Sequence, residues 1–189
     1  MGLFVLENKL KEDKLQWIEK CKSASMLQGV QLRDVHYILG SYIGNKISDT
    51  LYQHDSFAVV ILMRAGLPFG LGIADQLEKL GQKVSIHFIY NDVIPSETVN
   101  LLIDKTVVLV DAVINSGKSI FVVTEQLPLS VRESLIVATT VLPSESVNLF
   151  THFNLMAVRI SQNKYKGAKV KTIQNGKGPD TGDRLFGTL

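Results

Sequence analysis

Residues 106–119 read TVVLVDAVINSGKS, and this stretch decides the fold class. A short apolar run that ends in turn-forming residues predicts a buried strand over residues 106–111. The Asn115-Ser116-Gly117 sequence predicts a turn, and the apolar spacing beyond it predicts a helix over about residues 119–126. A strand, a short loop and a helix in this order form the repeating unit of parallel α/β proteins.

The rest of the chain repeats the same alternation. Further apolar runs predict strands over residues 57–63, 84–90, 134–142 and 155–160, and helical spacing predicts helices over residues 32–51 and 68–80. Strands that are apolar on both faces and separated by helix-length segments indicate a parallel sheet covered on both sides. Ligands bind beyond the carboxyl ends of such strands, so the loops after Arg64, Asn91, Asp111 and Ile160 are the candidate functional loops.

Composition narrows the function classes. The 189 residues, 46% of them hydrophobic, contain no repeat or linker that divides the chain, so we expect a single domain over residues 1–189. A net charge of +2 indicates no nucleic-acid partner. The start of the chain lacks the order of a signal peptide, and no apolar run approaches the ~18 residues of a membrane span. Together with a single cysteine, Cys21, these features predict a soluble, cytoplasmic protein.

The loop after the predicted central strand has the chemistry of a phosphate site. Residues 115–119 open a helix, where free backbone amides and the helix dipole attract an anion. Gly117 permits a close approach of the backbone, and the hydroxyls of Ser116 and Ser119 can donate to phosphate oxygens. Asp111, at the end of the strand, is an acceptor suited to a polyhydroxyl group such as ribose.

The residues of this loop leave two other interpretations open. Residues 112–119 fit a loosened P-loop pattern in which Ala112 replaces the first glycine, which predicts an ATP-dependent enzyme. Against that pattern, neither later predicted strand, 134–142 or 155–160, ends in an acidic residue suited to magnesium. In the plainest interpretation the segment is only a turn, with Asp111 as a helix cap.

Arg64 is the second candidate. In ILMRAGLPFGLG, residues 61–72, it directly follows an uncharged apolar strand, and Ala65-Gly66 allows a tight backbone. A guanidinium at this place can grip a pyrophosphate by two parallel hydrogen bonds. The alternative is a surface arginine that caps a loop. Four scattered histidines lack metal-ligand spacing, so we expect no protein-bound metal site.

Three motifs, in order, resemble those of the uracil branch of the type I phosphoribosyltransferases: ILMRAGLPFGLG, VVLVDAVINSGKS and the terminal GDRLFGT. The resemblance runs from about residue 4 to residue 188. It implies a mainly parallel central sheet flanked by helices with a small hairpin or hood. It also implies transfer of the 5-phosphoribosyl group from phosphoribosyl pyrophosphate (PRPP) to uracil, which gives UMP and pyrophosphate. Mg²⁺ would be bound through PRPP, and the protein would form a homodimer or higher homo-oligomer.

The same resemblance implies the roles of individual residues. Catalytic roles fall on Arg64, Asp111 and Asp180. PRPP would be bound by these three and by the loop residues Ala112, Val113, Ile114, Asn115, Ser116, Gly117, Lys118 and Ser119. Uracil would be bound by Ile173, Gly178, Asp180 and Thr181.

The chain departs from the family pattern at several positions. Asn91 stands where the family has Arg, Asn175 and Lys177 replace Pro and Leu in the base loop, and Pro179 is inserted. Two further hypotheses therefore stay open: a catalytically weak paralogue that binds PRPP or a uridine nucleotide as a regulatory protein, and a transferase with a different base. For the terminus, an ion pair between Asp183 and Arg184 is an alternative to a substrate contact.

Overall fold

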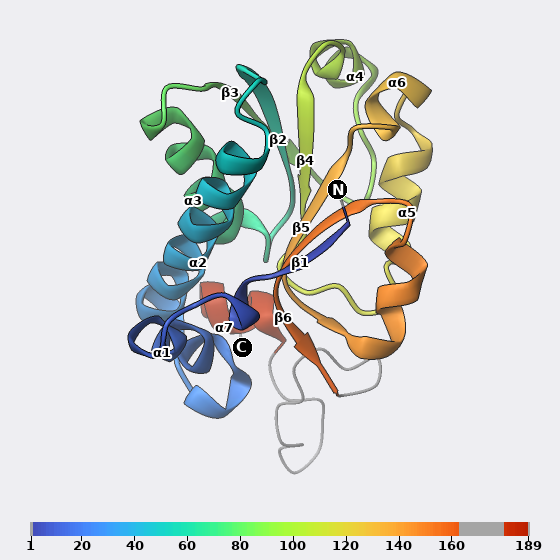
Figure 1. Ribbon diagram of the computed structural model, residues 1–189. Helices are drawn as coiled ribbons and strands as arrows, with labels where there is room; N and C mark the ends of the chain where they lie inside the picture. Colours follow the sequence, from blue (N-terminus) through green and yellow to red (C-terminus); the bar gives the residue numbers. More distant parts are fainter. Residues whose placement is uncertain (1, 163–179, 189) are drawn as a thin grey trace.

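The computed structural model describes residues 2–162 and 180–188, in which one sheet lies between two layers of helices (Figure 1). All strand pairs are parallel, and the order across the sheet is β1-β6-β5-β4-β2-β3. The strands are β1 Leu3–Val5, β2 Ser56–Leu62, β3 Lys83–Ile89, β4 Thr106–Val110, β5 Ile136–Pro143 and β6 Asn154–Ser161. The predicted fold class, a mainly parallel central sheet flanked by helices, is confirmed.

The helices divide between the two faces of the sheet (Figure 1). One face is covered by α1 Glu12–Cys21, α2 Gly29–Thr50 and α3 Leu67–Lys79. The other is covered by α4 Ser96–Leu102, α5 Lys118–Glu125, α6 Leu129–Arg132 and the 3₁₀ helix η3 Ser144–Phe150. Two short 3₁₀ turns, η1 Leu6–Asn8 and η2 Ser23–Ser25, flank α1.

Burial on both faces explains why the strand sequences are uninterrupted apolar runs. In β2, Phe57, Val59 and Ile61 pack under α2 and α3, whereas Ala58 and Val60 face the opposite layer, and none of the five is more than 1% exposed. A strand with only one buried face would alternate with polar residues instead. The central strands therefore supply both cores.

The predicted elements begin and end within three residues of the predicted positions; the largest difference is at α2, which starts at Gly29 rather than Leu32. The ten-residue helix α1 was not predicted, nor were the short elements β1, α4, α6 and α7, Thr181–Phe186. The short elements have too few residues to show a clear periodicity, and each is held by packing against its neighbours.

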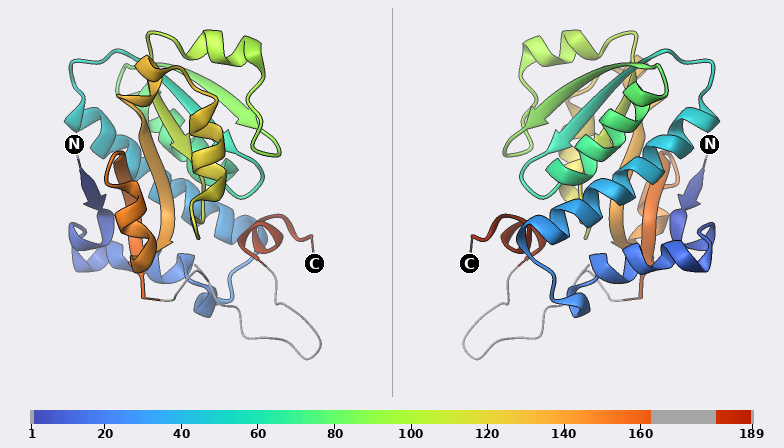
Figure 2. Two further views of the ribbon diagram at one scale, coloured as in Figure 1. Left: turned by 90° about the vertical axis from the view of Figure 1, so that its right-hand side faces the viewer. Right: turned by 90° about the vertical axis from the view of Figure 1, so that its left-hand side faces the viewer.

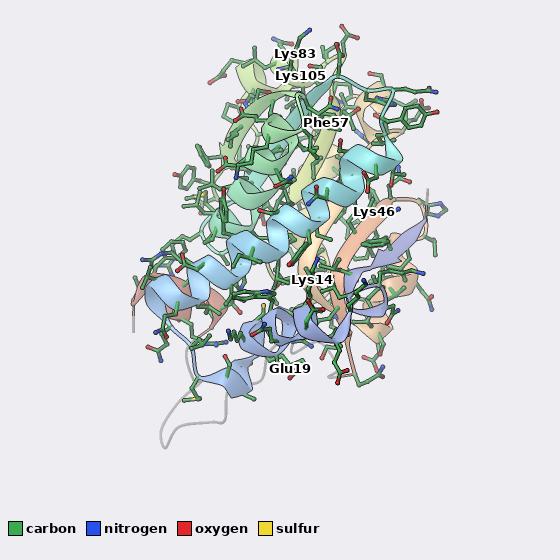
Figure 3. All side chains as sticks on the ribbon, turned by 60° about the vertical axis from the view of Figure 1, so that its left-hand side comes forward. Lys14, Glu19, Lys46, Phe57, Lys83 and Lys105 are labelled. Atoms are coloured by element: carbon green, nitrogen blue, oxygen red, sulfur yellow. The ribbon has the colours of Figure 1, made fainter. Side chains whose placement is uncertain are left out.

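The candidate loops all leave the carboxyl edge of the sheet, since every strand runs in the same direction. Helix α7 lies at this edge, beside the N-terminal end of α2 (Figure 2). Lys83 and Lys105, which stand at the start of β3 and just before β4, mark the opposite edge (Figure 3). The topology thus brings the C-terminal segment to the predicted ligand-binding edge.

Candidate functional site

The loop between β4 and α5 is a strand-to-helix junction, as predicted. Its shape depends on Gly117, which precedes α5 with a φ of 79°, in the left-handed region that favours glycine. A Cβ at this position would lie 2.7 Å from the ring of Phe150 and 2.9 Å from that of Phe121. These two rings stack with centroids 5.2 Å apart and pack against the turn at Gly117.

The first half of this loop is tied to β5, and in the second half the Asn115 carbonyl accepts from the Ser146 hydroxyl of η3. The carbonyl of Ala112 accepts from the Thr140 amide at 3.1 Å, and the Ile114 amide donates to the Val141 carbonyl at 3.0 Å. Beyond Ile114 the arrangement changes. No side chain caps α5, and among the residues that the structure describes none accepts a hydrogen bond from the amides of residues 115–120.

The side chains around these free amides are accessible. Asn115, Ser116 and Lys118 are exposed, and Ser119 is partly buried. Because the amides at the start of a helix carry partial positive charge, an open row of them is suited to a phosphate. Lys118 adds a full positive charge beside the row. The strand-to-helix junction is as the sequence predicts, and the binding of a phosphate there stays a prediction.

Asp111 lies at the end of β4, partly buried below this loop. Its Oδ1 accepts from the Val113 amide at 3.3 Å. Burial raises the pKa of the carboxyl to about 7, and the negative charge of Asp92 acts in the same direction. Near neutral pH the group can therefore both accept and donate, which suits contact with hydroxyl groups.

Asp92 reaches this edge through a tight turn after β3. Asn91 and Asp92 have φ values of 54° and 58°, and the Val93 amide donates to the Tyr90 carbonyl at 3.2 Å. Two successive left-handed residues define a type I′ hairpin turn, in which Asn and Asp are favoured. The side chain of Gln126 holds the turn by bonding to Asp92 and Ile94. Asn91 thus fits the backbone of the turn and supplies no positive charge.

Arg64 follows β2 and lies next to the C-terminal segment. Its side chain is half-exposed, and its Nη2 lies 3.2 Å from Oδ1 of Asp183. Its Nη1 donates to Oγ1 of Thr188 at 3.0 Å. Residues more than a hundred positions apart in the sequence therefore meet at the carboxyl edge.

The C-terminal helix α7 is a well-anchored element. Asp180 and Asp183 form a capping box, in which the Asp183 amide donates to Asp180 Oδ1 at 2.8 Å. Arg184 is only 4% exposed, and its Nη2 donates to the Leu27 carbonyl at 2.9 Å. The alternative of an ion pair between Asp183 and Arg184 is wrong, because Asp183 pairs with Arg64 and Arg184 points to backbone carbonyls.

Of the other residues predicted to bind uracil, only some lie within the part of the chain that the structure describes. Thr181 is the first residue of α7, directly after the exposed Asp180. Ile173 and Gly178, expected at the base, lie outside the described residues. The partners of Arg64, Asp183 and Thr188, were not predicted, although both belong to the terminal motif. The contribution of Asp92 to Asp111 was also missed, since nothing local in the sequence relates the two.

Cys21, which is partly buried, and the buried His36 form a pair close to α7, and the charge of Arg184 acts on both. Cys21 Sγ lies 3.5 Å from His36 Nε2, at the contact between α1 and α2. Burial raises the pKa of the thiol to about 11 and lowers that of the imidazole to about 3. Both groups are therefore neutral at physiological pH, and the thiol is a poor nucleophile.

Two general properties apply to residues 2–162 and 180–188. No three or more His, Cys, Asp or Glu side chains within these ranges are grouped so that they can hold a metal ion. No helix within them has the length and apolar character needed to cross a membrane.

Known proteins resemble the chain at two levels. The family model for uracil phosphoribosyltransferase matches residues 27–188. The AQ2163 protein from Aquifex aeolicus has a similar structure, with a TM-score of 0.64 and 14% identity over 94% of this chain and 96% of that one. At this identity, the similarity shows the fold alone.

A less similar structure is that of the HGPRT-ase from Leishmania tarentolae in complex with GMP. It has a TM-score of 0.48 and 12% identity over 80% of this chain and 77% of that one. A comparison with curated proteins found no match.

Proposed function

The chain belongs to the uracil phosphoribosyltransferase family, and from this premise we propose that it transfers the 5-phosphoribosyl group of PRPP to uracil, forming UMP and pyrophosphate. In a cell this reaction salvages a free pyrimidine base. The observation that carries the proposal is the open row of backbone amides at residues 115–120, on the same edge of the sheet as Arg64.

The two ends of PRPP suit the two halves of this edge. The 5-phosphate would bind the amides at the start of α5, with Ser116, Ser119 and Lys118 around it. Asp111, directly below, would accept from or donate to the ribose hydroxyls. A carboxyl with a pKa of about 7 suits this contact better than a full charge close to a phosphate.

Arg64 would bind the pyrophosphate group. A guanidinium has five N–H donors, and the bonds to Asp183 and Thr188 use only one hydrogen on each Nη nitrogen. The remaining donors, in a fixed plane, match the geometry of phosphate oxygens. Because this charge neutralises the leaving group as it departs, Arg64 acts in the transition state.

In the reaction, a ring nitrogen of the base attacks C1′ of the ribose while the bond from C1′ to the pyrophosphate oxygen breaks. The pyrophosphate leaves with the electron pair, and the base gives up the proton of the attacking nitrogen. Positive charge develops on the sugar ring, so the protein acts mainly by positioning and electrostatics. No covalent intermediate with the chain is required.

Magnesium enters this scheme with the substrate. The single partly buried carboxyl of Asp111 and the lack of an acidic cluster in the described ranges fit an ion carried by PRPP rather than a protein cage. When bound, Mg²⁺ neutralises pyrophosphate charge.

Asp180 is exposed next to Arg64's partners, and we propose that it faces the PRPP complex. Ile173, Gly178 and Thr181 are proposed to contact the base.

A second candidate function is a regulatory protein that binds PRPP or a uridine nucleotide without turnover. Asn91, exposed in its type I′ turn, favours this candidate because the turn supplies no cation to the pyrophosphate. The P-loop hypothesis is weaker, since β5 ends at Pro143 and β6 at Ser161, and neither is a ligand of the acidic type that such enzymes use.

The test mixes the protein with PRPP, Mg²⁺ and a panel of free bases, and measures pyrophosphate release and nucleotide formation. We expect uracil to be the best base, and Arg64→Ala to lose at least about tenfold in kcat/KM, which is about 1.4 kcal/mol of transition-state stabilisation. Lys83→Ala, at the opposite edge of the sheet, is the matched control and should keep full activity.

Each alternative has its own result in this experiment. Release with a base other than uracil would correct the substrate. A thermal shift with PRPP but no turnover with any base would support the regulatory candidate. A shift with ATP and none with PRPP would support the P-loop hypothesis and overturn the proposal.

A further inference from the structure

The partner of Arg64 is itself rigidly held. Oδ2 of Asp183 accepts from the Asp180 amide at 3.3 Å, and Oδ1 accepts from the Thr188 hydroxyl at 2.9 Å as well as from Arg64. The hydrogen bond from Thr188, followed by those from Asp180 and Arg64, lowers the pKa of this carboxyl. Asp183 is therefore an ionised acceptor whose orientation is set within its own segment.

The segment is in turn attached to the body of the protein. Arg33 on α2 donates to the Leu185 carbonyl at 2.6 Å, and the buried Arg184 bonds to carbonyls of the connection between α1 and α2. These bonds involve Leu185 and Arg184, not the two residues that contact Arg64. Helix α7 is thus a fixed support, although it has only six residues.

Arg64, in contrast, needs a support. A half-exposed arginine side chain on a loop has several rotatable bonds and about 2 kcal/mol of rotamer entropy. Each Nη nitrogen donates one hydrogen bond, and the two bonds together fix both the position and the plane of the guanidinium. The nitrogen Nε and one hydrogen on each Nη stay available for a ligand.

We propose that Asp183 and Thr188 are positioning residues, which hold the guanidinium of Arg64 in the orientation that binds pyrophosphate. This inference rests on the proposed function and adds the C-terminal segment to the pyrophosphate site. Two residues that do not touch the substrate thereby set the geometry of one that does. Because the pairing is reciprocal, bound pyrophosphate should also hold α7 more firmly.

The opposite role, in which the Asp183 carboxylate competes with pyrophosphate for Arg64, makes an opposite prediction. Loss of the carboxylate would then strengthen pyrophosphate binding. The rigid bonding of Asp183 to Asp180 and Thr188 favours positioning, because a competing carboxylate must be able to move aside.

The experiment measures the Kd of inorganic pyrophosphate with Mg²⁺ by calorimetry, and kcat and KM for PRPP, in four variants. Asp183→Asn and Thr188→Val should each weaken pyrophosphate binding and raise the KM for PRPP by about three- to fivefold, the size expected for a half-exposed charged pair. Thr188→Ser keeps the hydroxyl and should restore binding. Asp55→Asn removes an exposed pair with Lys83 at the far edge and is the matched control.

A purely structural role is separated by repeating both changes in an Arg64→Ala background. If Asp183 and Thr188 act through Arg64, neither change weakens binding further there. If Asp183→Asn fails to fold, Thr188→Val carries the test. Unchanged or tighter binding in an active protein would overturn the positioning role alone. A wild-type protein that neither binds pyrophosphate nor turns over PRPP would instead refute the proposed function.

Discussion

Replacing Asp111 with asparagine is expected to stabilise the folded protein above neutral pH. Burial raises the pKa of this carboxyl from 3.8 to about 7, so the folded state keeps a proton that the unfolded chain has released. The contribution of this group to the free energy of unfolding is fully present below pH 3.8 and is lost as the pH rises through about 7. Asparagine has nearly the same shape, can still accept from the Val113 amide, and does not ionise.

The size of the effect follows from the pKa difference. Between pH 5 and pH 7 the folded state holds the extra proton, and each pH unit changes the free energy of unfolding by about 1.4 kcal/mol. The stability gap between Asp111→Asn and the wild type should therefore widen by up to about 3 kcal/mol between pH 5 and pH 8. For a domain of this size, that corresponds to roughly 6–12 °C in Tm.

The assay is urea denaturation of both proteins at intervals between pH 5 and pH 8, with Asp55→Asn as an exposed control of the same chemistry. The control should run parallel to the wild type. If the difference in free energy of unfolding between Asp111→Asn and the wild type does not change with pH, folding does not raise the pKa of the carboxyl and the reasoning fails. In the activity assay we expect the same variant to lose phosphoribosyl transfer, so that stability and function move in opposite directions.

Two other changes test the loop and the buried pair. Gly117→Ala places a methyl group against the rings of Phe150 and Phe121 at a φ of 79°. It should lower the free energy of unfolding by about 1–3 kcal/mol in urea and weaken phosphate binding; an unchanged midpoint would show that the turn relaxes freely. Cys21→Ser should leave kcat/KM unchanged, because the thiol has a pKa of about 11, so it stays protonated, and its hydrogen-bond contact is with His36 rather than with a candidate site residue. A loss of turnover with normal folding would contradict that reasoning.

The pattern of the chain was enough to place the main elements of the fold. A strand such as β4 is buried on both faces, so its sequence is a continuous apolar run that is visible without any knowledge of its neighbours. Once the strands are parallel, their carboxyl ends share one edge, and Arg64 and Asp111 are brought to it by topology alone. The position of Gly117 at a turn before a helix is equally local.

Asn91 shows where local pattern was insufficient. Compared with the family motif, Asn91 replaces a positively charged arginine. In the structure it adopts the left-handed backbone conformation of a type I′ turn. The backbone conformation that favours asparagine there is set by the short connection from β3 to α4. The raised pKa of Asp111 has a similar origin, since it depends on the side chains that surround the carboxyl after folding.

The amino-acid order alone thus determined the strands, the helices between them and the edge at which the two candidate loops meet, because these depend on periodicity and on the direction of parallel strands. Only the tertiary structure decided that Arg64 pairs with Asp183 and Thr188, which follow it by 119 and 124 residues. Adjacent in sequence, Asp183 and Arg184 suggested an ion pair with each other. Their side chains leave α7 in different directions, and each one bonds to whatever the packing of α7 against the sheet edge and α2 places within reach.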